Sequence, residues 1–278
     1  MVLPQEPRLT PDAYAYLANL IHERSRIQLG PDRQALVSGR LAQRLHALQL
    51  DGFDAYCRLL ASAAGEEEVG RLIDLITTNH THFFREPSHF QLLAERVLPE
   101  VVASRGDRPL QVWSAAASSG EEPYSLAVVL AECARSHPHV TWHVHATDIS
   151  SRMLERCRSG IYEAGKVALP LEQLRRYFLR GFGEREGFCR VRPELRRRVL
   201  VQRVNLFQPE YPLPGGQDVI FCRNAMIYFD PESRQELLDR LVAMLAPGGF
   251  LFVGHAESLL GMRHPLQGEW PSVYRRPR

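Results

Sequence analysis

The spacing of the apolar residues changes near Pro109, and this change limits the possible folds more than any other feature of the sequence. Before it, apolar residues recur at the spacing of one face of an α-helix. After it, compact apolar runs alternate with segments of helical length. The chain is therefore predicted to contain a helical domain, followed by an open, mostly parallel sheet with helices on both faces.

Four helices are predicted in the first part. Thr10 followed by Pro11 is typical of a helix start, because Thr caps the first turn and Pro needs no hydrogen-bonded N–H there. The first helix follows these two residues, and the others cover Asp32–Leu48, Phe53–Ala64 and a segment beginning near Glu66.

The second part is expected to form the sheet. Around residues 169–200 the alternation breaks into short β-like pieces beside glycines, which indicates a small antiparallel insertion. The predicted domains are thus a helical domain at 1–76, a linker at 77–90 and a sheet domain at 91–278. Strands are expected at Leu110–Ala116, Val140–Ala146, Asp218–Cys222 and Phe250–Gly254, with helices at Glu122–Ser136, Ser150–Ser159 and Pro231–Ala246.

Composition excludes several classes of protein. In 278 residues, 34 Lys and Arg against 32 Asp and Glu leave a net charge of +2, too small to indicate nucleic-acid binding. The five cysteines form no CxxC pair, so neither a disulfide scaffold nor a zinc site is expected. No apolar run approaches the roughly 18 residues of a membrane span, and the N-terminus resembles no secretory signal. We expect a cytoplasmic protein that reaches membranes only through a partner.

Small residues follow the first predicted strand, and they let a backbone pass close to a ligand. The G-x-G-x-x-G pattern of dinucleotide-binding turns is absent. Glu121 and Glu122 stand where a pyrophosphate would rest and would repel it, so a ligand without phosphates and with a cationic or amino group is favoured. The alternative is that both glutamates only favour a helix N-terminus through its dipole.

The second predicted strand leads into Asp148. An acid at this place typically accepts hydrogen bonds from the hydroxyls of an adenosine ribose. The alternative is that Asp148 caps the next helix. Together with a loop that repels phosphate, this acid favours S-adenosylmethionine over NAD.

Two further polar segments are candidates for the same site. Residues 77–87, TTNHTHFFREP, carry more hydrogen-bonding side chains than a plain linker needs, so we interpret them as a wall of the ligand pocket. The alternative is a polar hinge with Phe83 and Phe84 in the core. After the strand Asp218–Cys222, Arg223, Asn224 and Tyr228 follow at a position where open sheets bind ligands.

Several long motifs occur in register over nearly the whole chain: TTNHTHFFREPSHF, WSAAASSGEEPYS, ATDIS, NLF at 205–207, FCRNAMIYFD and LAPGGFLFVGHAES. With them the sequence resembles the CheR family of chemotaxis-receptor methyltransferases. The resemblance implies S-adenosylmethionine-dependent O-methylation of glutamate side chains on methyl-accepting chemotaxis receptors. It also implies an α/β fold: a Rossmann-like methyltransferase sheet ending in an antiparallel strand, an N-terminal all-helical domain that faces the receptor, and a small inserted antiparallel β subdomain.

The resemblance also implies site residues. Arg85 and Tyr228 are expected nearest the transferred methyl group, as orienting residues. The residues that match cofactor contacts of the family are Asn79, Thr81, Arg85, Glu122, Asp148, Asn205, Leu206, Arg223 and Asn224.

No catalytic base or metal is expected. The acceptor carboxylate has an ordinary pKa near 4.3 and is already ionised at neutral pH. We therefore predict structural roles for His80, His82 and His255. His143 and His145 alternate on a predicted strand, and we interpret them as packing residues because the sequence offers no third metal ligand nearby.

Receptor recognition is predicted from charge. Arg33, Arg40 and Arg44 form one basic row beside the apolar row of their helix, which suits the glutamate-bearing helical bundles of receptors. The alternative is a solvated surface. In some family members the β subdomain binds a peptide from the receptor C-terminus; the alternative here is a structural lid. No nucleic acid and no direct membrane insertion are expected.

Two other functions stay open at this point. One is a non-catalytic CheR-like scaffold that binds receptors or cofactor. The other is a methyltransferase with a different acceptor, such as RNA or a small molecule.

Overall fold

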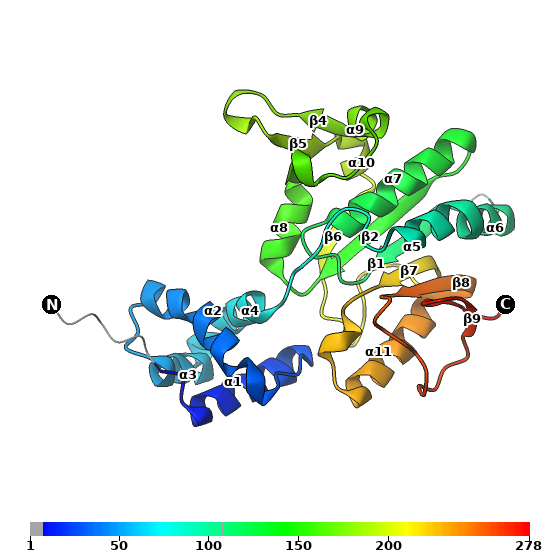
Figure 1. The fold of residues 1–278 in the computed structure, drawn as a ribbon. Helices are drawn as coiled ribbons and strands as arrows, with labels where there is room; N and C mark the ends of the chain where they lie inside the picture. Colours follow the sequence, from blue (N-terminus) through cyan, green and yellow to red (C-terminus); the bar gives the residue numbers. More distant parts are fainter. Residues whose placement is uncertain (1–7, 107) are drawn as a thin grey trace. The chain divides into compact units, whose positions relative to one another are not determined.

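The computed structural model describes residues 8–106 and 108–278. These form two compact units, one of residues up to Thr78 together with Tyr228–Ser233, and one of Asn79–Ile227 with Arg234–Arg278 (Figure 1). The N-terminal residues on which the absence of a secretory signal was argued lie partly outside the described range. Within that range no helix is long and apolar enough to cross a membrane.

The first unit is helical, as predicted. Thr10 accepts the N–H of Ala13 through its side chain and Pro11 opens the first helix. Leu17, Ile21 and Leu41 are fully buried, so the apolar rows meet in one core. The helices are α1 (Pro11–Ser25), α2 (Gln34–Ala47), α3 (Phe53–Ala61) and α4 (Glu66–Ile76), with 3₁₀ turns at Pro31–Arg33 and Ala63–Gly65.

The second unit is built on a seven-stranded sheet in the order β6-β2-β1-β7-β8-β10-β9. The pairs among β6, β2, β1, β7 and β8 are parallel, and β10 is antiparallel to β8 and to β9. This confirms the predicted sheet and its antiparallel final strand. The strands are β1 (Leu110–Ser114), β2 (Trp142–Asp148), β6 (Val199–Arg203), β7 (Gln217–Cys222), β8 (Leu245–Val253), β9 (Gln267–Trp270) and β10 (Val273–Arg275).

The strand order reverses at β1, whose chain neighbour β2 lies on one side and β7 on the other. Open sheets bind ligands beyond the carboxyl ends of the strands at such a point. The helices connecting the strands are α7 (Glu121–Ser136), α8 (Ser151–Ser159) and α11 (Pro231–Met244), and a 3₁₀ turn covers Met226–Tyr228.

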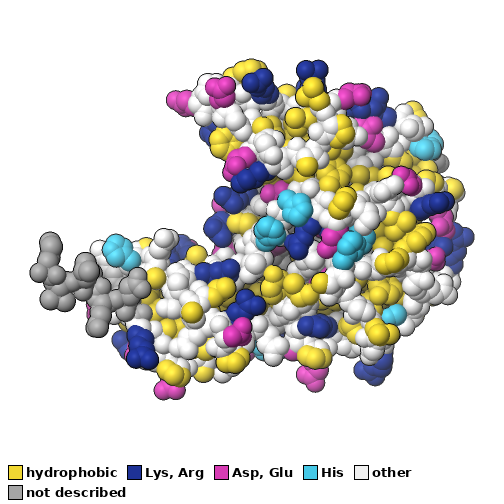
Figure 2. Space-filling view, viewed as in Figure 1, with side chains coloured by type: hydrophobic (Ala, Val, Ile, Leu, Met, Phe, Trp, Pro, Cys, Tyr) yellow, Lys and Arg dark blue, Asp and Glu magenta, His cyan; other side chains and the backbone are white. Residues whose placement is uncertain are grey.

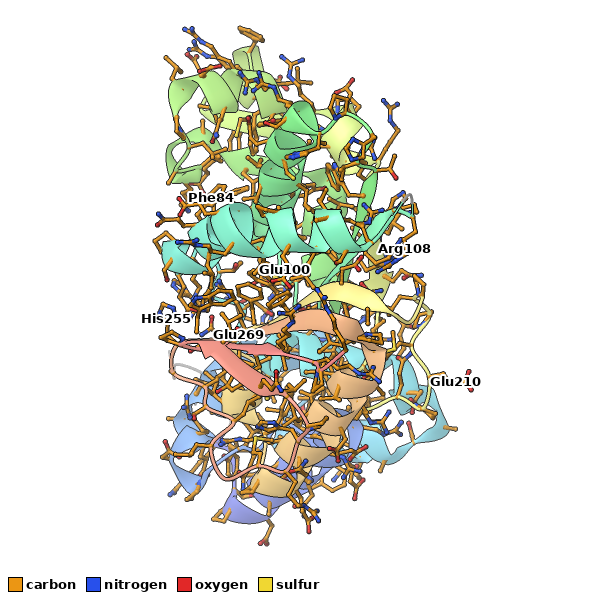
Figure 3. The ribbon with its side chains drawn as sticks, turned by 90° about the vertical axis from the view of Figure 1, so that its right-hand side faces the viewer. Phe84, Glu100, Arg108, Glu210, His255 and Glu269 are labelled. Carbon is orange, nitrogen blue, oxygen red and sulfur yellow. The ribbon has the colours of Figure 1, made fainter. Side chains whose placement is uncertain are left out.

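One helical run was missed by the sequence analysis. It comprises α5 (Pro87–Leu92), a π-helical turn at Leu93–Val97 and α6 (Leu98–Ser104). Figure 3 shows this run with Glu100 on it, beside the end of the sheet that carries Glu269, and Arg275 pairs with both acids. Its buried apolar residues recur at helical spacing, so the signal was present in the sequence.

The inserted β subdomain is confirmed as a three-stranded antiparallel sheet in the order β3-β5-β4. It begins upstream of the predicted stretch, because β3 belongs to it, whereas Val199–Arg203 belongs to the main sheet. Its elements are β3 (Ile161–Glu163), a 3₁₀ turn at Ala164–Lys166, α9 (Leu171–Tyr177), β4 (Phe178–Arg180), a 3₁₀ turn at Gly183–Arg185, β5 (Phe188–Val191) and α10 (Pro193–Arg196).

His145 is buried in β2, and its Nε2 lies 2.8 Å from the side-chain oxygen of Gln111. Burial, with a smaller contribution from His143, lowers the pKa of His145 from 6.5 to about 4. The imidazole is therefore neutral in the folded protein at neutral pH.

This histidine gives a pH dependence of stability. Between pH 6.5 and 4 the unfolded chain binds a proton that folded His145 does not, so the free energy of unfolding falls as the pH is lowered through this window. The full effect is about 3 kcal/mol. Urea unfolding of the wild type and of His145→Gln at several pH values measures it. The two proteins should differ in slope within the window, and parallel curves would contradict the prediction.

Candidate functional site

Asp148, at the end of β2, is held by two main-chain donors. Its carboxylate accepts the N–H of Ser118 at 2.8 Å and the N–H of Ser150 at 2.9 Å. The cap of α8 is Ser150, whose hydroxyl accepts the N–H of Met153. The alternative interpretation of Asp148 as the helix cap is therefore wrong, and its carboxylate is fixed at the carboxyl end of the strand.

The loop between β1 and α7 requires its small residues. Gly120 has a φ of +103°, and a Cβ there would lie 2.5 Å from the hydroxyl of Tyr162 and 2.8 Å from the sulfur of Cys157. The hydroxyl of Ser118 donates to the C=O of Asn79 at 3.3 Å. This loop is therefore joined to the predicted linker.

Both acids at the start of α7 have partners. Glu122 is buried; it accepts the hydroxyl of Ser114 at 2.7 Å and lies 3.1 Å from Nε of Arg223. Glu121 accepts the hydroxyl of Ser119 at 2.6 Å. Burial raises the pKa of both carboxyl groups, and for Glu122 the adjacent Arg223 opposes the rise. The cation nearest Glu122 is thus supplied by the chain itself, which the sequence analysis did not foresee.

Arg223, directly after β7, is almost fully enclosed, with 1% of its side chain exposed. Besides Glu122, it donates to the C=O of Arg85 at 2.6 Å and to Nδ1 of His89 at 3.2 Å. Its guanidinium lies 5.4 Å from the ring centre of Phe90. One side chain therefore connects the end of β7, the start of α7 and the predicted linker.

The predicted linker is polar, and its histidines His80 and His82 are exposed, whereas His89 is buried. Arg85 donates to the C=O of His80 at 2.8 Å, and Thr81 is half-buried. The rings of His80 and His82 lie 6.0 Å apart. Figure 2 shows histidine side chains beside basic ones on the face in view.

Asn205 and Leu206 follow β6, whose last residue, Arg203, lies opposite Asp148 in the register of the parallel strands β6 and β2. The side-chain oxygen of Asn205 accepts the N–H of Phe207 at 3.0 Å, and Leu206 is buried. These residues therefore begin a turn directly beyond the end of the strand that neighbours Asp148.

Two acids at this edge were missed by the sequence analysis. Glu86, with a φ of +58°, accepts the side-chain amide of Asn224 at 3.2 Å. Burial alone would raise the pKa of Glu86, but Arg223 and the hydrogen bond from Asn224 outweigh it, so the pKa is lowered. Glu257 accepts the N–H groups of Gly254 at 2.6 Å and Asn224 at 2.7 Å. The available signals were the place of Glu86 within the linker motif and the place of Glu257 shortly after β8.

One group of metal-ligating side chains occurs within the described residues: Glu86, His89 and His255 offer atoms within 4.8 Å of one another. Burial and Arg223 lower the pKa of His89 to about 4. Because Arg223 only donates, Nδ1 of His89 must accept, which places the ring proton on Nε2. A metal ion at His89 would therefore have to displace either a proton or Arg223.

The predicted basic row has internal partners. Arg44 forms a bidentate ion pair with the buried Glu68, which also accepts a hydrogen bond from the hydroxyl of Tyr56 at 2.9 Å. Arg40 donates to main-chain carbonyls at the end of α4, among them that of Thr77 at 3.2 Å. Arg33 is exposed and lies 3.7 Å from Asp32. Most of the charge in this row is therefore matched within the helical unit.

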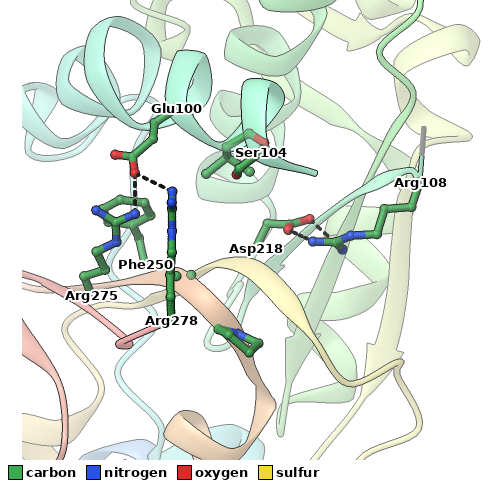
Figure 4. Close-up of a pocket in the computed structure, with 11 residues that line it drawn as sticks. Glu100, Ser104, Arg108, Asp218, Phe250, Arg275 and Arg278 are labelled. Atoms are coloured by element: carbon green, nitrogen blue, oxygen red, sulfur yellow. Dashed lines mark hydrogen bonds and ion pairs between the residues drawn. The ribbon is translucent and has the colours of Figure 1, made fainter. Parts of the chain in front are cut away.

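A cavity of about 340 Å³ lies at the opposite edge of the sheet, where β7 and β8 begin (Figure 4). Its arginines are paired within the cavity: Arg108 with Asp218, and Arg275 and Arg278 with Glu100. The charges of these side chains therefore balance one another.

Family models match both parts of the chain. Residues 12–77 match the CheR methyltransferase all-alpha domain, and residues 79–269 match the CheR methyltransferase SAM binding domain. The chain belongs to the CheR methyltransferase family. This confirms the resemblance, and it makes the sheet unit the family's domain for binding S-adenosylmethionine (SAM).

The sequence matches several relatives over almost their full length. The chain is 41% identical to the chemotaxis protein methyltransferase of Salmonella typhimurium, over 98% of this chain and 92% of the relative. It is 44% identical to the chemotaxis protein methyltransferase of Escherichia coli, over 91% of this chain and 87% of the relative. It is 38% identical to chemotaxis protein methyltransferase 2 of Pseudomonas aeruginosa, over 97% of this chain and 95% of the relative.

The residues at the carboxyl edge fit SAM by their chemistry. At the α7 N-terminus the charge of Glu122 is matched by Arg223, and its carboxylate oxygens can still accept hydrogen bonds from an amino group. Asp148, fixed by two N–H donors, presents a hydrogen-bond acceptor at the end of β2, as a ribose requires. The tight turn at Gly120 brings main chain close to the same place.

Glu257 should stabilise the folded conformation of the loop after β7. Glu257→Ala removes the acceptor of two close main-chain N–H groups, so we predict that it lowers the free energy of unfolding by about 3 kcal/mol. Glu210→Ala, at an exposed acid labelled in Figure 3, is the control and should stay within about 0.5 kcal/mol of the wild type. Urea unfolding measures both, and equal stability of the two variants would contradict the role of Glu257.

Proposed function

We propose that this protein transfers a methyl group from SAM to glutamate side chains of methyl-accepting chemotaxis receptors and so forms glutamate methyl esters. The names of its relatives, chemotaxis protein methyltransferases, support this. One observation carries the proposal: within the family's SAM-binding domain, predicted cofactor residues from separate segments are tied together by hydrogen bonds and an ion pair. Asn79 and Asp148 both bond to Ser118, and Arg223 contacts Glu122 and Arg85.

Each proposed cofactor residue has a role that follows from its place. Asp148 accepts the ribose hydroxyls, and Glu122, steadied by Arg223, faces the amino group of the methionine part. The remaining residues close the pocket around the cofactor: Asn79, Thr81 and Arg85 from the linker, Asn205 and Leu206 after β6, and Asn224 after β7.

The chemistry needs orientation more than proton transfer. When bound, SAM supplies a sulfonium methyl group that an ionised carboxylate accepts directly. The receptor glutamate is ionised at neutral pH, so no residue has to act as its base. Arg85 and Tyr228 orient the acceptor carboxylate, and the enclosed side chains of the site limit water around it.

Recognition of the receptor is the second part of the proposal. The helical unit presents Arg33 to the acidic helical bundle, and Arg40 and Arg44 add to the potential although they are paired internally. The β subdomain carries exposed apolar side chains, Phe182 at 79% and Phe188 at 40% exposure, suited to a peptide at its sheet edge. The protein acts in the cytoplasm, without nucleic acid and without inserting into the membrane.

A methyl-ester assay tests this function. The protein is incubated with labelled SAM and receptor-bearing membranes, and alkali is then added. We expect labelled methanol, because esters hydrolyse whereas methylated amines and nucleobases do not. Binding to receptors without any transfer would indicate a scaffold, and label stable to alkali would indicate a different acceptor; either result would overturn the proposal.

Asp148 should be decisive for cofactor affinity. We predict that Asp148→Ala weakens SAM binding by about 100-fold or more, because hydrogen bonds from two ribose hydroxyls to a carboxylate are lost. Asp148→Asn keeps one hydrogen-bond acceptor, so it should weaken SAM binding less than Asp148→Ala does. Glu155→Ala, at an exposed residue of α8, is the control. Titration calorimetry gives the affinities and thermal unfolding confirms the fold; unchanged affinity in folded Asp148→Ala would remove the assignment.

A further inference from the structure

One side chain of the inserted β subdomain contacts the loop between β1 and α7. Tyr162 lies in β3, the first strand of the subdomain, and is buried. Its hydroxyl donates to the C=O of Ser119 in that loop at 2.8 Å. Both residues belong to the sheet unit, so the contact lies within one compact part of the protein.

The loop that accepts this hydrogen bond also contacts two proposed cofactor residues. The N–H of Ser118 donates to Asp148, and its hydroxyl donates to the C=O of Asn79. The peptide group after Ser119 is held on both sides, because its C=O accepts from Tyr162 and its N–H, that of Gly120, donates to the C=O of Ala117 at 3.1 Å. Tyr162 therefore helps to fix the main chain directly beside the residue that holds Asp148.

The ring of Tyr162 contacts a second proposed wall of the pocket, the linker. The buried Phe83, between Thr81 and Arg85, packs edge to face against Tyr162, with ring centres 4.9 Å apart. Phe83 also contacts Phe178 of β4, with ring centres 5.7 Å apart. The β subdomain thus contacts both the loop and the linker through Tyr162.

The Tyr162 hydroxyl can only serve as a structural donor at neutral pH. Burial raises its pKa well above the usual range, so the hydroxyl stays protonated. A protonated phenol keeps its hydrogen bond to a neutral carbonyl over the whole physiological pH range.

We propose that Tyr162 is a positioning residue of the SAM site, through which the β subdomain holds the β1–α7 loop and the linker in the conformation that binds the cofactor. The inference rests on the proposed function, because it takes this loop and the linker as walls of the cofactor pocket. It gives the β subdomain a part in cofactor binding in addition to its proposed part in receptor recognition.

Loss of the hydroxyl should weaken SAM binding through the free protein. In Tyr162→Phe the ring stays, but the C=O of Ser119 loses its buried donor, which favours other conformations of the loop. When only about a tenth of the free protein holds the binding conformation, the dissociation constant rises about 10-fold.

Two other tyrosines are matched controls. The hydroxyl of the buried Tyr124 donates to the C=O of Cys157 at 2.9 Å, so Tyr124→Phe loses the same kind of hydrogen bond. The hydroxyl of Tyr177, in α9 of the β subdomain, donates to Glu132 at 2.7 Å. Both acceptors lie outside the β1–α7 loop and the linker.

Titration calorimetry with SAM and urea unfolding of the full-length wild type and the three variants test the inference. We expect Tyr162→Phe to weaken SAM binding about 10-fold, and Tyr124→Phe and Tyr177→Phe to stay within about 2-fold of the wild type. The urea midpoint should fall by similar amounts in Tyr162→Phe and Tyr124→Phe, because each loses one buried hydrogen bond. Unchanged affinity in folded Tyr162→Phe would overturn the inference, and so would an equal loss in Tyr124→Phe, since affinity would then follow stability alone.

Hydrogen exchange of the ligand-free proteins observes the loop directly. The main-chain N–H groups of residues 115–120 should exchange faster in Tyr162→Phe than in the wild type, and at about the wild-type rate in Tyr124→Phe. Equal exchange in Tyr162→Phe and the wild type would contradict the positioning role.

Failure of the proposed function is distinguishable from failure of the inference. A wild type that binds SAM but forms no methyl ester with receptors would refute the proposed function and leave the comparison of the variants intact. A wild type without measurable affinity for SAM would refute both.

Discussion

The buried charge of Arg223 is the interaction on which the site at the carboxyl edge depends. A guanidinium withdrawn from water needs a compensating charge and hydrogen-bond acceptors, and here these come from two other segments: the carboxylate of Glu122 at the start of α7, and the C=O of Arg85 and the ring of His89 in the linker. The charge requirement of one side chain therefore fixes segments that are far apart in the sequence. Removal of Glu122 would take away the nearest negative charge, which lies 3.1 Å from Nε of Arg223, and would leave Glu86 at 3.9 Å as the remaining acid.

The two edges of the sheet differ in how their polar groups are used. At the amino edge, the arginines around the cavity pair with acids on the same cavity wall, and the charges cancel. At the carboxyl edge Arg223 likewise pairs with Glu122, and main-chain N–H groups in addition fix the acids Asp148 and Glu257 in defined positions. Fixed acceptors beyond the ends of parallel strands are what a cofactor with hydroxyl and ammonium groups needs.

The sequence predicted the architecture well, because helices and strands depend on local patterns, whereas the candidate site residues stay predictions. Helical spacing predicted α1 to α4, and apolar runs predicted β1, β2, β7 and β8, whereas the parallel strand β6 was not predicted. Partners distant in the chain were not predictable: nothing in the sequence pairs Arg44 with Glu68, or Tyr228 with the end of α1. The helical run after Pro87 was visible in its apolar spacing and was overlooked beside the polar linker motif. The cation next to Glu122 could be identified only from the three-dimensional structure, because Arg223 follows Glu122 by about a hundred positions in the chain.

The most direct measurement of the central claim is a crystal structure of this chain with S-adenosylhomocysteine. The account predicts the ribose hydroxyls on the carboxylate of Asp148, with the homocysteine part near Glu122 and the Arg223 pair intact. It would be contradicted by a ligand in the cavity lined by Arg108 and Glu100, or by a ligand at the carboxyl edge that makes no contact with Asp148.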